Sequence, residues 1–231
     1  QVYARIGGVL YLIIIVIGLF CETFVRDRLI VSGDATATAN NIMASQLLWR
    51  IGISAELVML ACAIALAMIF YVLLRAVSRN LALLAVFFNL VSIALEAADM
   101  LNLFAALFLV KGAEYLKTFE PSQRQTLAYL FLKLHGYGYA VSLVFFGFFC
   151  LFIGYLIFKA SYFPKTLGVL MIGVFLSYLI DGFALFLAPK LAAMIFPAIL
   201  VPAFIGELSL CLWLLVKGVN LSKWEEGRGQ V

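Results

Sequence analysis

The sequence predicts an all-α integral membrane protein, a bundle of six transmembrane helices with short interfacial helices in two long loops. Composition is the first reason, since 66% of the 231 residues are hydrophobic and only 12% are charged. Soluble globular chains carry roughly 45–50% apolar and 25% charged residues. This composition excludes a soluble enzyme, a disordered chain and a secreted disulfide scaffold, because such proteins could not hide so much apolar surface from water.

The second reason is a series of apolar runs, each close to the about 20 residues that a membrane-crossing helix needs. Backbone polar groups find no water inside a bilayer, so each run should be helical despite its β-branched residues. The first run is followed by no small-residue cleavage pattern and is interpreted as a retained span. We expect one domain, residues 1–231, with spans at about 6–25, 51–74, 82–110, 139–158, 166–187 and 196–216.

Two of the connections between spans are long. Residues 26–50 contain a turn signal before an expected short helix, and residues 111–138 contain Glu120-Pro121-Ser122, which is typical of a second helix start. An even number of spans places both termini on one side, together with the short loops 75–81 and 159–165. These loops carry basic residues and no acid. Lys and Arg are equally numerous on the two sides, eight on each, so their total does not orient the chain. Bases close to span ends weigh most, and those of the two short loops therefore predict cytoplasmic termini, in a bacterial inner (plasma) membrane.

The net charge and the positions of the cysteines limit the kinds of partner that we expect. A net charge of +4 fits basic loops beside anionic headgroups, so the lipid bilayer is an expected partner and nucleic acid is not. The cysteines lie inside apolar runs without metal-ligand spacing and are interpreted as small hydrophobic residues. Nucleophile triads, phosphate-binding loops and dinucleotide fingerprints are absent from the sequence. The sequence identifies no cofactor, leaves open whether the protein is an enzyme, and favours a role without catalysis.

Acidic residues inside the predicted spans are the main functional signal. Half of the 12 acidic residues lie there: Glu22, Glu56, Glu96, Asp99, Asp181 and Glu207. No Lys or Arg is expected at a comparable depth. An acid at the centre of a spanning helix costs about 2.5–3.5 kcal/mol on insertion scales. Protonation, hydrogen bonding to neighbouring groups or a bound cation must offset this cost.

The polar residues of the third span share one face. At about 100° per residue, an arc of about 80° holds Asn89, Ser92, Glu96 and Asp99. A polar stripe of this kind would be unstable against lipid. It should therefore face the bundle interior or a wet cavity.

Helical rise predicts that this stripe joins polar residues from other spans. At about 1.5 Å per residue, Glu96 and Glu207 lie near mid-membrane, and Asp99, Asp181 and Glu56 lie toward the side opposite the termini. We also expect Pro202 to free the carbonyl of Ala198 near Glu207. The predicted ligand-binding residues are Glu96, Asp99, Asp181, Glu207, Glu56, His135, Asn89 and Tyr178.

Each of these residues also has a structural interpretation. Glu56 lies in the first turns of its helix, where the helix dipole favours an acid. The deeper carboxylates could be protonated or hydrogen-bonded groups that join helices. His135 precedes Gly136-Tyr137-Gly138-Tyr139, a loop-proximal stretch in which it would be an interfacial hydrogen-bonding residue.

Several stretches resemble a known family. They are YARIGGVLYLIIIVIGLF near the start, LHGYGY, LVFFGFFCLFIGYLIFKASYFPKTLGVLM, YLID and GELSLCLWLLVKGVN. The chain resembles, along nearly its whole length, the bacterial domain of unknown function 4386 family. The resemblance implies a multi-span bacterial membrane protein with no established activity, and His135, Asp181 and Glu207 fall on motif positions. The chain departs from the family pattern at Phe149, where a histidine often stands.

Three functions are consistent with these features. The first is a transporter-like protein that binds or carries a proton or a cationic small solute in an acidic intramembrane cavity. The second is a non-catalytic scaffold or accessory subunit whose polar stripe contacts a membrane protein partner. The third is a membrane metalloenzyme in which carboxylates and His135 hold a metal. The metalloenzyme is the least supported, because the chain has a single histidine and no H-E-x-x-H spacing.

Overall fold

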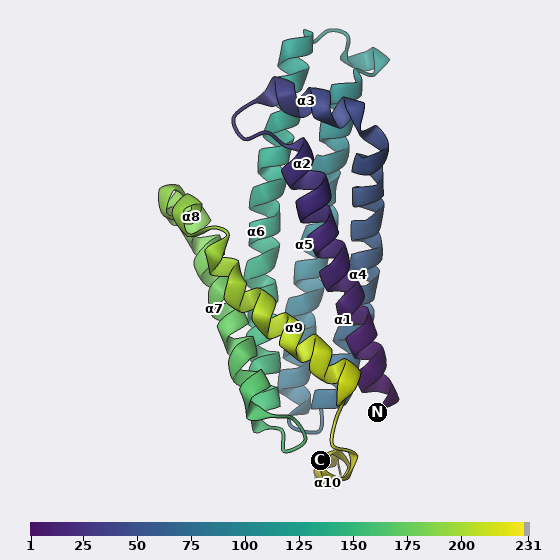
Figure 1. Ribbon diagram of the computed structural model, residues 1–231, viewed down its shortest axis with the longest axis vertical. Helices are drawn as coiled ribbons and strands as arrows, with labels where there is room; N and C mark the ends of the chain where they lie inside the picture. The colour runs from purple at the N-terminus through teal and green to yellow at the C-terminus, as the bar shows by residue number, and fades with distance from the viewer. Residues whose placement is uncertain (229–231) are drawn as a thin grey trace.

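The computed structural model describes residues 1–228 and, within that range, contains helices and no strand. Six helices in this part of the chain are long and apolar enough to cross a membrane, which confirms the predicted class. Figure 1 shows them as a bundle with both ends of the described chain at one side. The candidate spans are Val2–Leu29, Gln46–Leu74, Arg79–Lys111, Pro121–Lys159, Lys165–Leu187 and Ala198–Val216.

The first span is longer than its apolar run. Helix α1 (Val2–Phe20) continues through a π-helical segment (Cys21–Arg26) into α2 (Asp27–Leu29). Residues 26–29, which the sequence assigns to a loop, therefore belong to the helix. The predicted short helix of this loop is α3 (Ala35–Ala44), and the side chain of Asp34 caps it by accepting the N–H of Ala37 at 2.8 Å.

The second and third spans form an antiparallel pair. Helix α4 (Gln46–Leu74) is followed by α5 (Arg79–Lys111), whose first turn is capped by Ser78. Helix α5 ends at Gly112, which has a φ of 66°. This left-handed conformation is one that glycine adopts without a steric cost, so α5 ends there in spite of the apolar residues before it.

The fourth span differs most from the sequence-based expectation. Helix α6 (Pro121–Lys159) is continuous over 39 residues, so residues 121–138 are not a loop with a separate short helix. A capping box between Glu120 and Gln123 starts the helix. Interior glycines cost a helix only about 1 kcal/mol each, and packing against α5 and α7 can offset that. The remaining connection holds only a short 3-10 helix, η2 (Glu114–Leu116).

The end of the chain folds back across the bundle. Helix α7 (Lys165–Leu187) leads to the short α8 (Pro189–Ile195), a 3-10 turn η3 (Ala198–Leu200), α9 (Val201–Val216) and α10 (Leu221–Arg228). Figure 1 shows α9 crossing the bundle obliquely. Pro202 lies in the first turn of α9, where a missing N–H costs little. The carbonyl of Ala198 accepts the N–H of Val201, so it is not freed near Glu207 as the sequence suggested.

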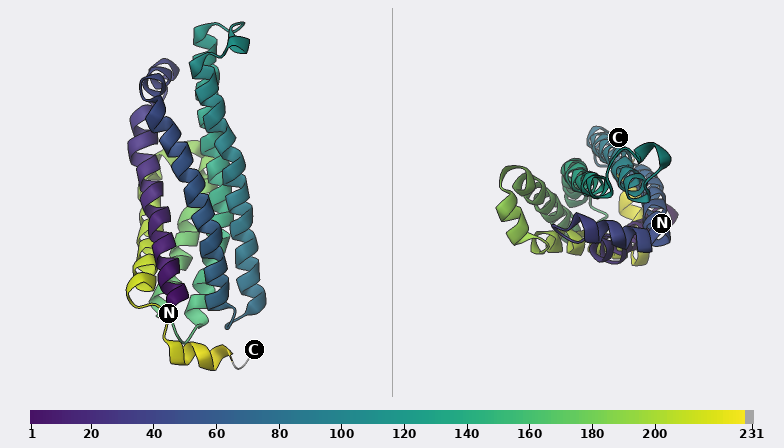
Figure 2. Two further views of the ribbon diagram at one scale, coloured as in Figure 1. Left: turned by 90° about the vertical axis from the view of Figure 1, so that its right-hand side faces the viewer. Right: turned by 90° about the horizontal axis from the view of Figure 1, so that it is seen from above.

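The six spans form a closed ring. Helix α1 packs on α4, α4 on α5, α5 on α6, α6 on α7, α7 on α9, and α9 again on α1. The views in Figure 2 show α5 and α6 standing away from α1 and α9 across the bundle. Between α6 and α7 the backbones nearly touch, because a Cβ on Gly168 would lie only 2.6 Å from the carbonyl oxygen of Gly154.

The half of the ring nearest the termini is closed by an apolar core. Within this core the ring of Phe70 packs edge to face on two others. Its centroid lies 6.2 Å from that of Tyr11 and 5.9 Å from that of Phe149. A second core packs α4, α5 and α6 together at the opposite end, around the fully buried Trp49. Open space inside the ring is thereby restricted to its middle and to the end away from the termini.

Candidate functional site

A cavity of about 420 Å³ lies inside the ring, and we call it the inner chamber. Its walls are mostly aliphatic and aromatic side chains from α1, α4, α6 and α9. The polar groups reach it from four helices: Asn89, Ser92 and Glu96 on α5, Tyr139 on α6, Tyr178 on α7 and Glu207 on α9. The polar stripe of the third span thus faces the interior, and it meets the acid of the sixth span there.

Glu207 is held in the wall of the inner chamber by neighbouring side chains. The residue is only 9% exposed, and its Oε1 accepts a hydrogen bond of 2.5 Å from the hydroxyl of Tyr178. Tyr11 on α1 is a further close neighbour of this carboxyl group. None of the described residues that line the inner chamber is basic. The carboxyl group therefore has tyrosine partners and no counter-charge.

Asn89 adds a polar side chain to the wall of the same chamber. The residue is 3% exposed, and its Oδ1 has no hydrogen-bond partner among the described residues. Ser92, one turn further along, instead donates to the carbonyl of Ser142 on α6 at 2.9 Å. Glu96 borders the chamber without a hydrogen bond or ion pair to any described side chain. A buried acceptor without a donor is costly, as at Asn89 Oδ1. The Glu96 carboxyl group is only partly buried, so it can accept from a donor or water in the chamber.

A second cavity of about 470 Å³ adjoins the first, and we call it the outer chamber. It lies between α1, α6, α7 and α8, nearer the end away from the termini, and Glu22, Arg26, His135 and Asp181 reach it. Four residues line both chambers: Gly18, Tyr139, Leu143 and Leu200. The two spaces are therefore separated by no more than a layer of shared side chains.

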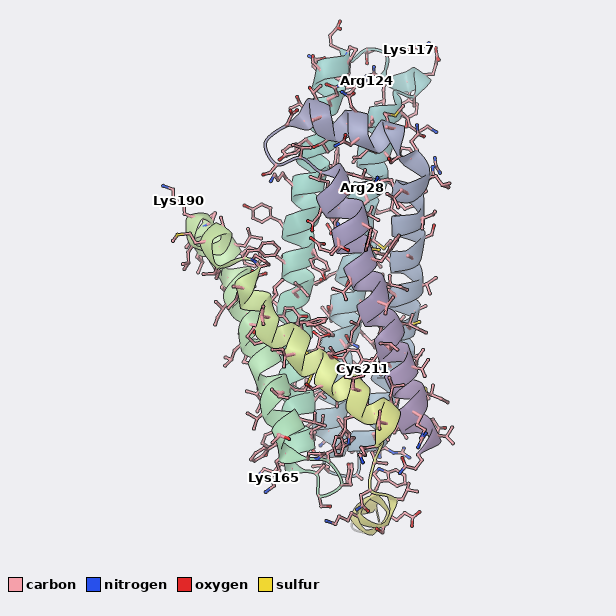
Figure 3. All side chains as sticks on the ribbon, in the orientation of Figure 1. Arg28, Lys117, Arg124, Lys165, Lys190 and Cys211 are labelled. Carbon is pink, nitrogen blue, oxygen red and sulfur yellow. The ribbon has the colours of Figure 1, made fainter. Side chains whose placement is uncertain are left out.

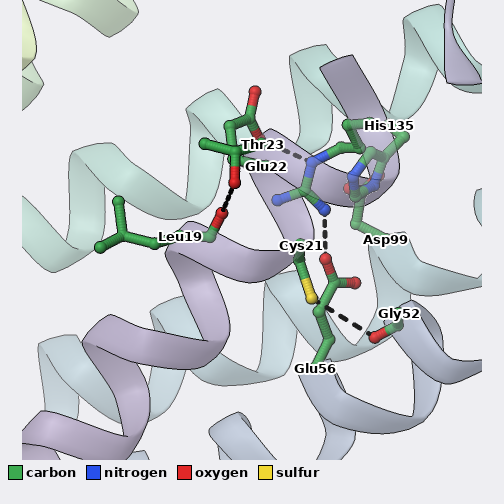
Figure 4. Close-up of polar contacts among 9 residues, drawn as sticks. Leu19, Cys21, Glu22, Thr23, Gly52, Glu56, Asp99 and His135 are labelled. Atoms are coloured by element: carbon green, nitrogen blue, oxygen red, sulfur yellow. Dashed lines mark hydrogen bonds and ion pairs between the residues drawn. The ribbon is translucent and has the colours of Figure 1, made fainter. Parts of the chain in front are cut away.

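Arg26 corrects the expectation that no base lies at the depth of the acids. Its Nε donates to Oε2 of Glu22 at 2.7 Å, and its Nη1 donates to Oε1 of Glu56. Figure 4 shows Glu22 and Glu56 together with Asp99 and His135 in this cluster. The expectation was wrong because the first helix continues beyond its apolar run and carries Arg26 into the bundle.

Asp99 and His135 form a second buried pair. His135 Nδ1 lies 2.6 Å from Asp99 Oδ2, within ion-pair distance but without the alignment of a hydrogen bond. Asn102 Nδ2 donates to Asp99 Oδ1 at 2.7 Å. The carboxylate packs against Gly138, where a Cβ would lie 2.1 Å from Asp99 Oδ1. His135 is thus a buried residue within α6 and not a loop-proximal one, as the sequence suggested.

The structure divides the predicted ligand-binding residues into three groups. Asn89, Glu96, Tyr178 and Glu207 meet at the inner chamber, and His135 and Asp181 reach the outer one. Asp99 and Glu56 line neither chamber, and each is held by a partner side chain.

Sequence reasoning did not select Arg26, Tyr139 or Tyr11. The Glu22–Arg26 spacing of four residues is a helical ion-pair signal and could have indicated that the first helix continues. Tyr139 is the last residue of the LHGYGY stretch, but no local feature indicates that it borders two cavities. Within residues 1–228, no group of three or more His, Cys, Asp or Glu side chains is placed to hold a metal ion.

Six helices long and apolar enough to cross a membrane define a multi-span membrane protein, and several acidic side chains border the cavities between them. The chain belongs to the family described as "Domain of unknown function (DUF4386)", whose model matches residues 6–218. It is similar to an "Uncharacterized protein" of Archaeoglobus fulgidus, with 28% identity over 160 residues, which are 69% of this chain and 79% of the relative. No solved structure matches the chain. Because this relative is archaeal, a bacterial origin remains a prediction.

Proposed function

We propose that this protein binds a small organic cation inside the membrane, in the inner chamber. The observation that carries the proposal is the convergence of the Glu207 and Glu96 carboxyl groups on a cavity of about 420 Å³, which Asn89 also lines. None of the described lining residues is basic, so a bound cation would supply the missing positive charge. Arg26 and His135 serve other carboxylates and do not line this chamber.

The chemistry of the lining favours a particular kind of cation. Carboxylate and amide oxygens accept hydrogen bonds, so they favour a cation with N–H groups. The remaining wall is apolar, with Phe146, Phe204 and several aliphatic residues, and it would remove a hydrocarbon group from water. Cavities of about 300–1,000 Å³ commonly hold small organic ligands. An alkylamine is therefore a better match than a bare metal ion, which would find few oxygen ligands here.

The test is the thermal stability of the purified full chain in detergent, measured with increasing concentrations of n-hexylamine hydrochloride. A ligand that binds only the folded state raises Tm as its concentration rises. We expect a saturable rise for the wild type and none for Glu207→Gln, which keeps the shape of the side chain but removes its charge.

A matched control separates this effect from general electrostatics. Glu114 is an exposed residue of η2 that pairs with Lys117 and lines neither chamber. Glu114→Gln should keep the full Tm response. A wild type that shows no saturable response, or a Glu207→Gln variant that responds normally, would contradict the proposal.

Transport of the bound cation would be a further property of the same site. Uptake of radiolabelled hexylamine into proteoliposomes, compared between wild type and Glu207→Gln, tests it directly. Glu207-dependent uptake would support a transporter, and binding without uptake would restrict the proposal to a receptor or storage role.

We also propose that the termini face the cytoplasm, in the plasma membrane. Basic side chains at the terminal end lie over aromatic rings, with Lys159 Nζ 5.8 Å from the Tyr155 ring and Lys165 Nζ 5.6 Å from the Phe158 ring. Figure 3 shows Lys165 at this end of the bundle. The two short connections at this end, residues 75–81 and 159–165, carry basic residues close to the span ends and no acid, which the positive-inside rule assigns to the cytoplasm. Alkaline phosphatase fused after residue 231 should be inactive, and an active fusion would reverse the orientation.

A further inference from the structure

The two chambers together have a shape and charge pattern that a single amine would not fill. The outer chamber adds about 470 Å³ to the inner 420 Å³, and the lining residues Gly18, Tyr139, Leu143 and Leu200 are common to both. Gly18 has no side chain to obstruct this boundary, since a Cβ there would meet only Met59 Sδ at 3.9 Å. Together the two adjoining chambers make one longer cavity, with these shared residues at its middle.

Carboxyl groups lie at both ends of this longer cavity. Glu207 lies at the inner end, and Asp181 borders the outer chamber, half-buried. Asp181 forms no hydrogen bond or ion pair with the described side chains, unlike Glu22, which is bound to Arg26. Leu143 and Leu200 separate the two ends with apolar surface. Glu207 and Asp181 thus border different chambers with apolar side chains between them, and Glu96 adds a further carboxyl group on the inner side.

The outer end is attractive to a cation in spite of Arg26. That guanidinium is bound to two carboxylates, Glu22 and Glu56, so the three side chains carry more negative than positive charge. Asp181 adds a further carboxyl group on the facing helix. A second positive group would therefore find an acceptor at this end.

The positions of Glu207 and Asp181 indicate how far apart the two positive groups would be. Tyr178, whose hydroxyl bonds Glu207, and Asp181 lie three residues apart on α7. At about 1.5 Å per residue they are about 4.5 Å apart along that helix, and the Tyr178 side chain spans the remaining distance to Glu207. An alkyl chain with one ammonium group can occupy only one of the two acidic ends, and the other end would keep its desolvation cost.

We propose that the inner and outer chambers form one site for a linear diamine or polyamine, with one ammonium group at Glu207 and a second at Asp181. The apolar middle packs on the methylene chain, and Tyr139 lies beside it. This inference rests on the proposed function and adds the class of ligand. It predicts that affinity depends on the number of ammonium groups and on their separation.

The experiment is isothermal titration calorimetry on the full chain in detergent with matched pairs of amines. We expect 1,6-diaminohexane to bind at least tenfold more tightly than n-hexylamine. In a series of diaminoalkanes from four to ten carbons, affinity should pass through a maximum, because only one range of lengths reaches both carboxyl groups.

Two variants test whether the second ammonium group binds in the outer chamber. Asp181→Asn should reduce the affinity for 1,6-diaminohexane to that for n-hexylamine and leave n-hexylamine binding unchanged. The matched control is Asp27→Asn, since Asp27 is an exposed residue of α2 that lines neither chamber. Gly136→Leu is a second variant, because Gly136 lines the outer chamber on α6 and a Cβ there meets nothing within 4 Å. Its added side chain should remove the diamine advantage without a clash.

The outcomes distinguish this inference from the proposed function. Equal affinity for the monoamine and the diamine overturns the two-ended site while hexylamine binding at Glu207 still stands. A normal diamine advantage in both Asp181→Asn and Gly136→Leu overturns the assignment of the outer end. Failure of every amine to bind the wild type overturns the proposed function itself.

Discussion

The hydroxyl of Tyr178 on α7 donates a hydrogen bond of 2.5 Å to Oε1 of Glu207 on α9. This bond joins two spans that meet at the wall of the inner chamber. It orients the carboxyl group and provides a polar partner that lipid could not supply.

Replacing Tyr178 with Phe should both destabilise the fold and weaken ligand binding. A hydrogen bond to a buried acid contributes about 1–3 kcal/mol when its partner is removed. We expect a lower Tm in detergent and a severalfold weaker affinity for n-hexylamine. The control is Tyr137→Phe, because Tyr137 is 44% exposed and lines neither chamber. Loss of stability with unchanged amine affinity would restrict Tyr178 to a structural role.

Arg26 should be essential for stability because two acids depend on it. Arg26→Gln leaves Glu56, whose side chain is only 7% exposed, without its counter-charge. Breaking a buried ion pair in this way costs about 3–5 kcal/mol. The double variant Arg26→Gln with Glu56→Gln should recover a large part of the lost stability, since no unpaired charge remains.

The measurement for this pair is Tm across the four members of the double-mutant cycle. Arg28→Gln is the control, because Arg28 is exposed in the same helical segment. Additive effects of the two substitutions would show that Arg26 and Glu56 do not stabilise each other.

The contact between α6 and α7 requires glycine on both sides. A Cβ on Gly168 would lie 2.6 Å from the carbonyl oxygen of Gly154 and 2.7 Å from the backbone N of Phe158. Gly168→Ala should therefore push the helices apart and cost about 1–3 kcal/mol of stability, as overpacking does. Gly173→Ala in the same helix meets nothing within 4 Å and should change Tm little or raise it. Equal Tm values for the two variants would refute this account.

The position of the Asp99 carboxylate depends on Gly138, which it packs against. A methyl group at Gly138 would lie 2.1 Å from Asp99 Oδ1, so Gly138→Ala should displace the carboxylate from His135 and Asn102. We expect a clear fall in Tm, measured beside Gly136→Ala. That control lies on the same helix, two positions earlier, where a Cβ meets no neighbour. A similar response from both variants would indicate a general intolerance of α6 to side chains.

The sequence was informative about class and spans because those depend on local composition. Each of the spans contains an apolar run of about the bilayer thickness, and no other segment of residues 1–228 does. The direction of the polar stripe was also predictable, since Asn89, Ser92 and Glu96 are related by the helical period alone. Helix boundaries were less predictable where polar residues or glycines follow an apolar run. The first helical segment continues through Arg26, and α6 continues through Gly136 and Gly138.

The partners of the acids depend on how distant segments pack. Arg26 and Glu56 are 30 residues apart and meet because α1 lies against α4, and Glu207 finds Tyr178 because α9 crosses α7. No local pattern distinguishes Glu56, which is neutralised by a base, from Glu207, which is not. The sequence by itself therefore determined a six-span helical membrane protein with acids turned inward, because hydropathy and helical period are local properties. Only the tertiary structure decided which acids are paired and which face open space, because that depends on contacts between helices remote in the chain.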